Sequence, residues 1–275
     1  MSKFKGKALY KPEGKAGEYA RWACNLFNGC SNDCSYCYCK KGILSHAMGG
    51  TTPTLKKCFK DEDDAFKQFK KEFDAHYGEL RREGGVFFSF STDPCLPETF
   101  PLTIKCVDYA VTHEVHCHIL TKCVDWLKDE DVQMYLREYR RNISVGFTLT
   151  GCDEEEPGAP TNALRILAMK ICHNHGVKTF ASIEPIVKLG SSLEMIRKTK
   201  DVCDLYKIGL MSGVKKDYYD TTELLSFVML VNGQFQGRSA KVYWKESIRQ
   251  RLVKAGYGSY LHTENSVEHD YDVLA

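Results

Sequence analysis

Residues 143–183 read ISVGFTLTGCDEEEPGAPTNALRILAMKICHNHGVKTFASI, and their pattern indicates the fold class. The apolar and β-branched run at 143–149 predicts a strand, and a helical stretch at 161–175 follows an acidic loop. Gly176 is placed to end that helix, and a second strand is expected at 179–183. A strand, a helix and a strand in this order predict two parallel strands joined by a crossover helix.

The same alternation of strand-length and helix-length patterns continues on both sides of this unit. Further strands are expected at 21–27, 86–90, 115–120, 205–208 and 241–244. Further helices are expected at 61–82, 102–112, 124–140, 191–200, 218–231 and 246–255. About seven strands, most of them followed by a helix, predict an α/β fold, a partial (β/α)6-type TIM barrel of parallel strands with outer helices.

The composition fits one soluble globular enzyme, with 275 residues, 43% hydrophobic and 27% charged. No Pro/Gly/Ser-rich linker divides the chain, so we expect a single domain over 1–275, with an N-terminal arm at 1–18, a barrel core at 19–256 and an acidic tail at 257–275. No apolar run approaches the roughly 20 residues of a membrane span. The start is lysine-rich and lacks the apolar stretch of a secretory signal, so we expect a cytoplasmic protein with no membrane partner.

The charge is unevenly distributed along the chain. Residues 1–60 hold eleven Lys or Arg and three Asp or Glu, whereas the rest of the chain is net acidic. A basic N-terminal fifth indicates either contact with phosphates, as in a nucleic acid, or an ordinary solvated surface. Both interpretations stay open at this point.

Cysteines provide the strongest chemical signal. The chain has 13, an odd number, and without an export signal metal binding or catalysis is favoured over disulfides. Cys30-Ser-Asn-Asp-Cys34-Ser-Tyr-Cys37 is a C-x3-C-x2-C run in one polar loop. Three thiolates this close can hold three corners of a cubane iron–sulfur cluster and leave one iron open to a ligand. A zinc site completed by Cys39 or Cys24 is the alternative.

Polar side chains follow nearly every expected strand. In barrels of this class the chemistry lies at the C-terminal ends of the strands. The side chains at these ends are Ser91, Thr92, Asp93, Thr121, Lys122, Thr148, Thr150, Ser182, Glu184, Ser212 and Lys245. Each one could be a cap or turn residue, but together they predict a single site at one rim.

The cysteine run, with Tyr36 just before its third cysteine, resembles the S-adenosylmethionine (SAM) radical superfamily. The resemblance implies a [4Fe-4S] cluster held by Cys30, Cys34 and Cys37, whose open iron binds SAM. It further implies that the reduced cluster cleaves SAM to a 5′-deoxyadenosyl radical, which abstracts hydrogen from a substrate. An electron donor such as a flavodoxin or ferredoxin would then be a partner.

Residues 23–185 more closely resemble the spore photoproduct lyase-like branch, also called DNA-repair-photolyase-like. The matching segments are 34–38, 91–93, 121–122, 147–150 and 156–158, with Arg165 following. The resemblance implies that SAM is lined by Thr92, Asp93, Lys122, Thr148 and Ser182, with Glu184 near the ribose or the substrate. A carboxylate and a hydroxyl suit the SAM ammonium group, and a lysine suits its carboxylate.

One position departs from that branch. The family's lyase carries a hydrogen-donor cysteine just before the Ser91-Thr92-Asp93 motif, where this chain has Phe90. Cys95 and Cys152 are the candidate replacement donors, with an inert thiol as the alternative for each. Tyr36 and Tyr38 are candidate relays between substrate and SAM, with packing over the cluster as the alternative.

The whole chain resembles the radical SAM mobile pair protein B group, on segments 6–8, 47–50, 91–94, 181–185 and 205–209. This resemblance suggests a partner radical SAM protein but no substrate. Three functions therefore remain: a radical SAM enzyme acting on a nucleic acid, one acting on a peptide or small molecule, and an iron–sulfur or zinc redox-sensing binding module. Salt-dependent DNA binding separates the first two, and SAM turnover separates both from the third.

Overall fold

The computed structural model describes residues 5–42, 45–215 and 217–275. Within these residues one sheet holds eight strands in the order β1-β2-β5-β6-β7-β8-β9-β10. Their bounds are Leu9–Tyr10, Ala23–Cys24, Val86–Phe88, Cys117–Thr121, Ile143–Thr148, Lys178–Ile186, Leu205–Leu210 and Lys241–Trp244. β1 is antiparallel to β2, and every other neighbouring pair is parallel. The α/β fold with a parallel sheet is thus confirmed, and a strand lies in each of the seven stretches predicted.

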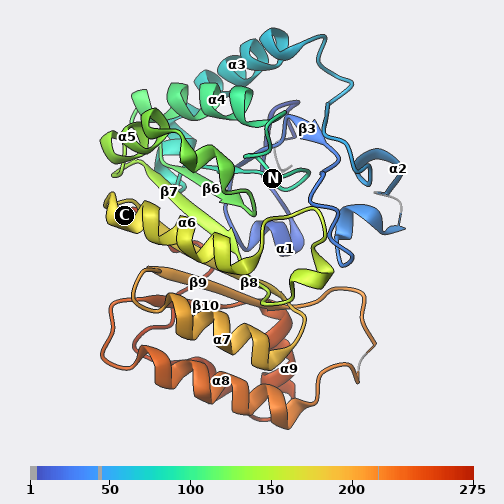
Figure 1. Cartoon of the computed structure of the whole chain (residues 1–275), viewed down its shortest axis with the longest axis vertical. Helices are drawn as coiled ribbons and strands as arrows, with labels where there is room; N and C mark the ends of the chain where they lie inside the picture. The colour runs from blue at the N-terminus through green and yellow to red at the C-terminus, as the bar shows by residue number, and fades with distance from the viewer. Residues whose placement is uncertain (1–4, 43–44, 216) are drawn as a thin grey trace.

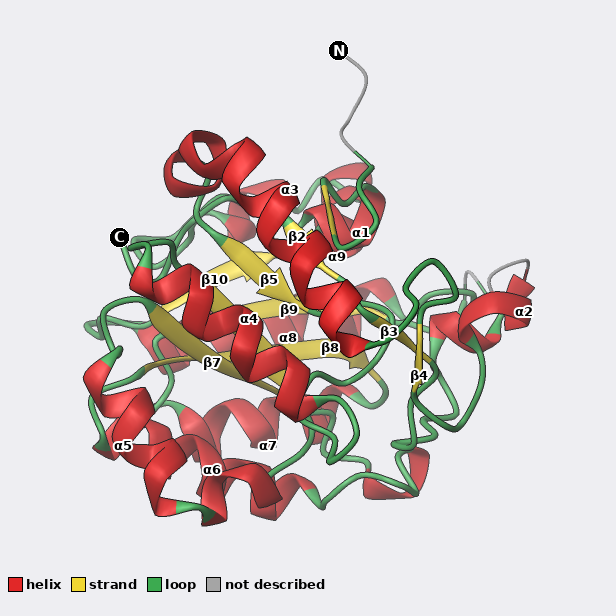
Figure 2. Cartoon of the chain, turned by 90° about the horizontal axis from the view of Figure 1, so that it is seen from above, coloured by secondary structure: helices red, strands yellow, loops and turns green. Residues whose placement is uncertain are grey.

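Helices connect the strands and cover them from outside, as Figures 1 and 2 show for α4, α5, α6 and α7. The helices are α1 Gly14–Gly17, α2 Ser45–Met48, α3 Glu62–Arg82, α4 Phe100–Thr112, α5 Glu130–Glu138, α6 Asn162–Asn174, α7 Leu189–Thr199, α8 Thr221–Phe235 and α9 Glu246–Lys254. A separate two-stranded sheet pairs β3 Phe27–Asn28 with β4 Thr54–Leu55. Short 3₁₀ turns lie at Tyr38–Lys40, Asp125–Lys128, Asp153–Glu155 and Gly258–Leu261.

The single helix expected at 124–140 is divided into two. A 3₁₀ turn ends at Lys128, and α5 begins after Asp129, whose carboxylate accepts a hydrogen bond of 2.9 Å from Asp131 N. An N-cap aspartate stabilises a new helix start because it pairs an amide that has no partner inside the helix. The sequence pattern spans both pieces because their apolar residues face the same core.

The core lies between the helices and the sheet. In α3 the residues Phe69, Phe73 and Leu80 are fully buried and form part of the core. Phe69 packs against Phe88 of β5, with ring centroids 6.4 Å apart. Burying each such ring contributes about 1.5–3 kcal/mol, so α3 is held to the sheet by its apolar face.

The sheet ends at β1 on one side and at β10 on the other. No ladder of backbone hydrogen bonds joins β10 to β1 or β2 in the described part of the chain, so the barrel is partial. Glu18 accepts hydrogen bonds from Tyr243 (2.9 Å) and Glu246 N (2.6 Å), which joins the N-terminal segment to β10 and α9. Asp272 contacts His116, just before β6, at 2.6 Å. The C-terminal segment also bonds to β10 through its backbone, since Val267 N donates to Val242 O at 3.0 Å.

No helix in the described ranges is both long enough and apolar enough to pass through a membrane.

Candidate cofactor and substrate cavity

A cavity of about 450 Å³ opens at the C-terminal ends of the strands, within the size range of small-molecule sites. It is lined by residues from loops after β3, β5 and β6, from β7 and β8, and from the segment after β9. Eleven of the predicted site residues line it, namely Cys30, Cys34, Cys37, Tyr36, Tyr38, Thr92, Asp93, Lys122, Thr148, Ser182 and Glu184. The structure thus brings together at one rim side chains that are far apart in the sequence.

The cysteine loop is shaped by its backbone. Gly29 has a φ of 80° and Asp33 has a φ of 49°, both in the left-handed region that permits tight turns. Cys30 N donates to Gly50 O at 2.9 Å, and Cys37 N donates to Cys34 O at 3.3 Å. These bonds hold the three thiols on the cavity wall, and all 13 cysteines of the chain are free of disulfides.

The three thiols differ in acidity. Burial raises the pKa of Cys30 to about 11 and also raises the pKa of Cys34. A hydrogen bond from Cys39 lowers the pKa of Cys37 to about 6. Iron binds the thiolate form of cysteine. The low pKa of Cys37 favours its thiolate, whereas Cys30 and Cys34 would lose their protons when iron binds.

No group of three or more His, Cys, Asp or Glu side chains among the described residues is arranged to hold a single metal ion. A cubane cluster differs from a single ion, because each thiolate binds its own iron and the thiols need not converge on one point. Three thiols on one wall of a cavity of this size therefore fit such a cluster by their chemistry.

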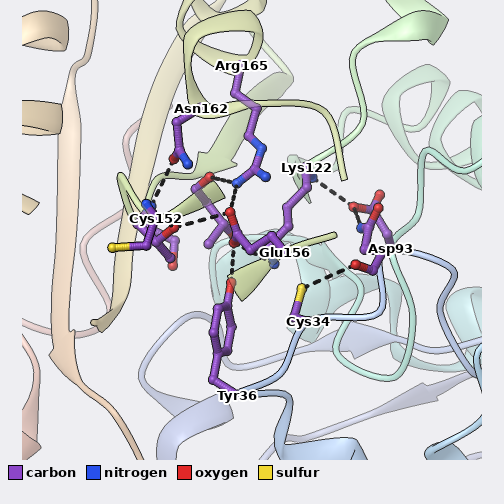
Figure 3. A network of polar contacts seen from close by, with 12 residues as sticks. Cys34, Tyr36, Asp93, Lys122, Cys152, Glu156, Asn162 and Arg165 are labelled. Carbon is purple, nitrogen blue, oxygen red and sulfur yellow. Dashed lines mark hydrogen bonds and ion pairs between the residues drawn. The ribbon is translucent and has the colours of Figure 1, made fainter. Parts of the chain in front are cut away.

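Asp93 ties the cysteine loop to the strands, as Figure 3 shows. Its Oδ1 accepts from Thr121 Oγ1 (2.6 Å) and Cys95 N (3.0 Å). Its Oδ2 accepts from Asn32 Nδ2 (2.8 Å) and Lys122 N (2.7 Å). The carboxylate is therefore saturated by the protein, and its predicted contact with a SAM ammonium group remains a prediction.

Thr92 offers a hydroxyl to the cavity. Its Oγ1 is buried and has no hydrogen-bond partner in the described part of the chain. A buried hydroxyl without a partner costs free energy unless a ligand or water pairs with it. Thr92 therefore fits the predicted role of contacting a polar ligand.

A buried ionic network lies behind the cysteine loop (Figure 3). Glu156 pairs with Arg165 Nη1 at 2.7 Å, and both side chains are fully buried. Glu156 Oε1 accepts a hydrogen bond from the Tyr36 hydroxyl and lies 4.0 Å from Lys122 Nζ. Burial opposes the charge of Lys122, but Cys34 and Glu156 outweigh it and raise its pKa. Lys122 thus stays cationic beside the cavity, as a site for an anionic ligand group requires.

The Glu156-Pro157-Gly158 segment packs directly against the cysteine loop. Gly158 N donates to Asn32 O at 3.1 Å, and Ser35 N donates to Glu155 O at 2.9 Å. A Cβ added at Gly158 would overlap Ser31 O, so the two loops approach too closely for a side chain. This contact explains why glycine is required at this position.

A second polar cluster, around Glu184, also lines the cavity. The Tyr19 hydroxyl lies 2.6 Å from Ser182 Oγ and donates to Glu184 Oε2 at 3.0 Å. Lys245 Nζ pairs with Glu184 Oε2 at 2.5 Å and is fully buried. Lys245 was expected at the rim, and its ammonium group is already paired with Glu184.

Two further residues, Tyr19 and Lys15, also line the cavity and were not predicted from the sequence. Both belong to the N-terminal segment, and α1 lies close to β8 in Figure 1. Lys15 Nζ is 3.6 Å from Glu184 Oε1. No local pattern marks these residues, because their neighbours are separated from them by more than 150 positions in the chain.

Solved structures of other proteins share this architecture. A mutant of spore photoproduct lyase aligns with a TM-score of 0.58 at 13% identity, over 96% of this chain and 78% of that chain. The chain has the fold of spore photoproduct lyase. A second mutant of the lyase, with bound AdoMet and dinucleoside spore photoproduct, aligns with a TM-score of 0.56 at 13% identity, over 92% of this chain and 77% of its own.

Two protein sequences are also similar to the chain. An uncharacterized protein of Methanocaldococcus jannaschii is 27% identical over 217 residues, which are 74% of each chain. An uncharacterized protein of Acidianus two-tailed virus is 24% identical over 213 residues, 70% of this chain and 67% of its own. No family model matches the chain.

The two candidate donor thiols are not among the cavity-lining residues. Cys95 and Cys152 are both buried, and burial raises the pKa of each. Phe90, at the position where the lyase family carries its donor, lines the cavity and stacks on Phe87 with ring centroids 4.6 Å apart. The Tyr38 hydroxyl donates to Phe90 O. The catalytic roles of both cysteines and of Tyr36 and Tyr38 stay predictions.

Proposed function

We propose that the chain is a radical SAM enzyme, with a [4Fe-4S] cluster on Cys30, Cys34 and Cys37. The observation that carries this proposal is that these three cysteines line the same cavity as Lys122 and as Thr92, whose hydroxyl has no hydrogen-bond partner among the described residues. The likeness in fold to spore photoproduct lyase supports it. Cluster and SAM, when bound, would supply the one-electron chemistry that removes a hydrogen atom from a substrate.

The chain's own residues would orient these groups. Lys122 is positioned to pair with a carboxylate such as that of SAM, and Thr92 and Thr148 provide hydroxyls on the same wall. Glu156 keeps the Tyr36 side chain fixed between two of the cysteines. Tyr36 is half-buried and the side chain of Lys122 is 16% exposed, which limits water near the reacting groups.

We propose a nucleic acid as the first substrate class to test. Lys15, Lys40 and Lys122 line the cavity, and the N-terminal fifth of the chain is basic. The alternative substrate is a peptide or small molecule. Fluorescence anisotropy with a labelled oligonucleotide, repeated at rising salt, distinguishes them: binding that weakens steeply with salt supports a nucleic acid, and no binding at low salt contradicts it.

The decisive test of the proposed function is anaerobic. The protein is reconstituted with iron and sulfide, reduced and given SAM, and 5′-deoxyadenosine is quantified by mass spectrometry. Cys34→Ala is expected to abolish the product, while Cys58→Ala, an exposed cysteine outside the cavity, is expected to retain it. We propose a flavodoxin or ferredoxin as the reductant in the cell. We also propose a second radical SAM protein as a partner, to be sought by co-purification.

The remaining outcome of this assay defines the third function. A chain that binds iron or zinc but does not cleave SAM, with or without added oligonucleotide, would be a redox-sensing binding module. Product that persists in Cys34→Ala would instead contradict the cluster assignment.

A further inference from the structure

The cavity is also lined by a carboxylate, Glu184, one of whose oxygens accepts no hydrogen bond from the described residues. Glu184 Oε2 is engaged by Lys245 Nζ at 2.5 Å and by the Tyr19 hydroxyl at 3.0 Å. Glu184 Oε1 is buried and has no hydrogen-bond partner among the described residues. Glu184 lines the cavity, so the carboxylate that carries this oxygen adjoins the space that a bound molecule would fill.

The position of this carboxylate is built into the fold. Lys245 is fully buried and donates to Glu184 Oε2 and to Lys15 O (3.1 Å), while Glu18 Oε2 lies 3.6 Å away. A Cβ on Gly209 of β9 would lie 2.8 Å from Glu184 Oε1 and 2.9 Å from Lys245 Cδ. Glycine at this position therefore leaves the space that the two charged side chains occupy.

Lys15 places a hydrogen-bond donor beside this acceptor. Its Nζ lies 3.6 Å from Glu184 Oε1 and donates to Leu210 O at 2.9 Å. An ammonium group has three hydrogens, so two remain for other partners. The side chain of Lys15 is 43% exposed, whereas that of Glu184 is 14% exposed, so the donor can adjust and the acceptor is fixed.

An acceptor and a donor side by side complement the N–H and C=O of an amide. We propose that Glu184 and Lys15 form a subsite for an amide or imide edge of the substrate. Glu184 Oε1 accepts the N–H, and Lys15 Nζ donates to the neighbouring carbonyl. A neutral group fits here because Glu184 and Glu18 are already balanced by Lys245 and Lys15.

This inference rests on the proposed function in one respect: SAM would bind beside the cysteines and Lys122, so that Glu184 and Lys15 are left to the substrate. The subsite itself consists of side chains present without any cofactor. It can therefore be tested on the purified full-length chain, separately from SAM cleavage.

The test uses succinimide, a small imide, and N-methylsuccinimide, which keeps the carbonyls but lacks the N–H. Binding is followed by saturation-transfer NMR and by shifts of a ¹³C-methyl label on Met211, which lines the cavity. Succinimide is expected to bind the wild-type chain, and N-methylsuccinimide is expected to bind at least about tenfold more weakly, as for the loss of a charge-assisted hydrogen bond.

Two variants test the residues. Glu184→Gln presents an amide N–H to the cavity and is expected to lose succinimide binding. Glu184→Gln also removes the negative charge that faces the buried Lys245, so a second variant is needed. Lys15→Met changes a half-exposed side chain, and it too is expected to weaken the binding of succinimide. Glu154→Gln, an exposed change outside the cavity, is the matched control and is expected to bind like the wild type.

Equal binding of the two probes, unchanged binding in a folded Glu184→Gln or in Lys15→Met, or no binding of succinimide to the wild type would each overturn the subsite. None of these results bears on 5′-deoxyadenosine formation. Conversely, a chain that fails to cleave SAM can still bind succinimide, so the two proposals fail separately.

Discussion

Asn32, inside the cysteine loop, donates a hydrogen bond of 2.8 Å to Asp93 at the end of the second parallel strand. The same carboxylate accepts the backbone N–H of Lys122 at 2.7 Å from the loop after the third strand. One buried carboxylate therefore sets the relative positions of the cysteines and of the lysine that faces the cavity. The candidate site depends on this frame before any ligand binds.

Replacing Asp93 by Asn tests this frame. The amide retains one acceptor oxygen, but its NH₂ group would face two of the four donors that now bind Asp93. We expect the free energy of unfolding to fall by about 3 kcal/mol, since buried donors that lose their acceptor are costly. Urea unfolding measures the change. Asp63→Asn, at the exposed start of α3, is the control. If the two variants lose equally little free energy of unfolding, Asp93 does not hold the two loops in position.

Glu156→Gln tests the buried network behind the cysteine loop. Removing the negative charge leaves Arg165 buried without its partner at 2.7 Å, so we expect a loss of about 4 kcal/mol in stability. The double variant Glu156→Leu with Arg165→Met should recover much of this loss, because it buries no unpaired charge. Denaturant unfolding of both variants checks the prediction, which fails if the double variant is less stable than the single one.

Gly158→Ala tests the contact between the two loops. A Cβ at this position would overlap Ser31 O, so the cysteine loop has to move. We expect the variant to retain clearly less iron after reconstitution and to unfold at a lower temperature. Gly190→Ala is the matched control, because nothing lies within 4 Å of its Cβ and alanine favours a helix. Equal iron content in the two variants would show that the contact does not position the cysteines.

Lys207 predicts a specific pH dependence. Burial and then Lys245 lower the pKa of Lys207 to about 7, from a value of 10.5 in water. Between these two values the unfolded chain binds more protons than the folded chain, so stability rises with pH across this window. The destabilising contribution is complete below pH 7 and disappears above the pKa of the unfolded lysine.

In Lys207→Met the free energy of unfolding is therefore expected to rise less between about pH 7 and 9.5 than in the wild type. The difference between the two chains, measured by urea unfolding at several pH values, isolates this residue. Lys207 Nζ also donates to Glu18 O at 3.0 Å and Tyr19 O at 2.8 Å, so the variant loses these bonds at every pH. Parallel pH profiles for the two chains would contradict the prediction.

Local patterns in the sequence were sufficient to predict the alternation of strands and helices. The period of the apolar residues reports which face of each element is buried, and burial is the main stabilising contribution. The same patterns could not predict the break at Asp129, because both pieces share one apolar face and differ only in an N-cap contact. Short elements such as β1 and α1 were missed for a related reason: each is stabilised by distant residues, as when Glu72 accepts from Leu9 N at 2.7 Å.

For the candidate site, the C-x3-C-x2-C spacing and the polar residues at the ends of the strands can be identified from the sequence alone. These are local features, and a parallel barrel brings the ends of its strands to one rim whatever the remaining details. The three-dimensional fold was needed to find that Tyr19 and Lys15 also line the cavity, that Asp93 accepts four hydrogen bonds, and that Lys245 is paired with Glu184. The reason is physical: hydrogen bonds and ion pairs depend on distances of a few ångströms between residues remote in the chain, which no local pattern encodes.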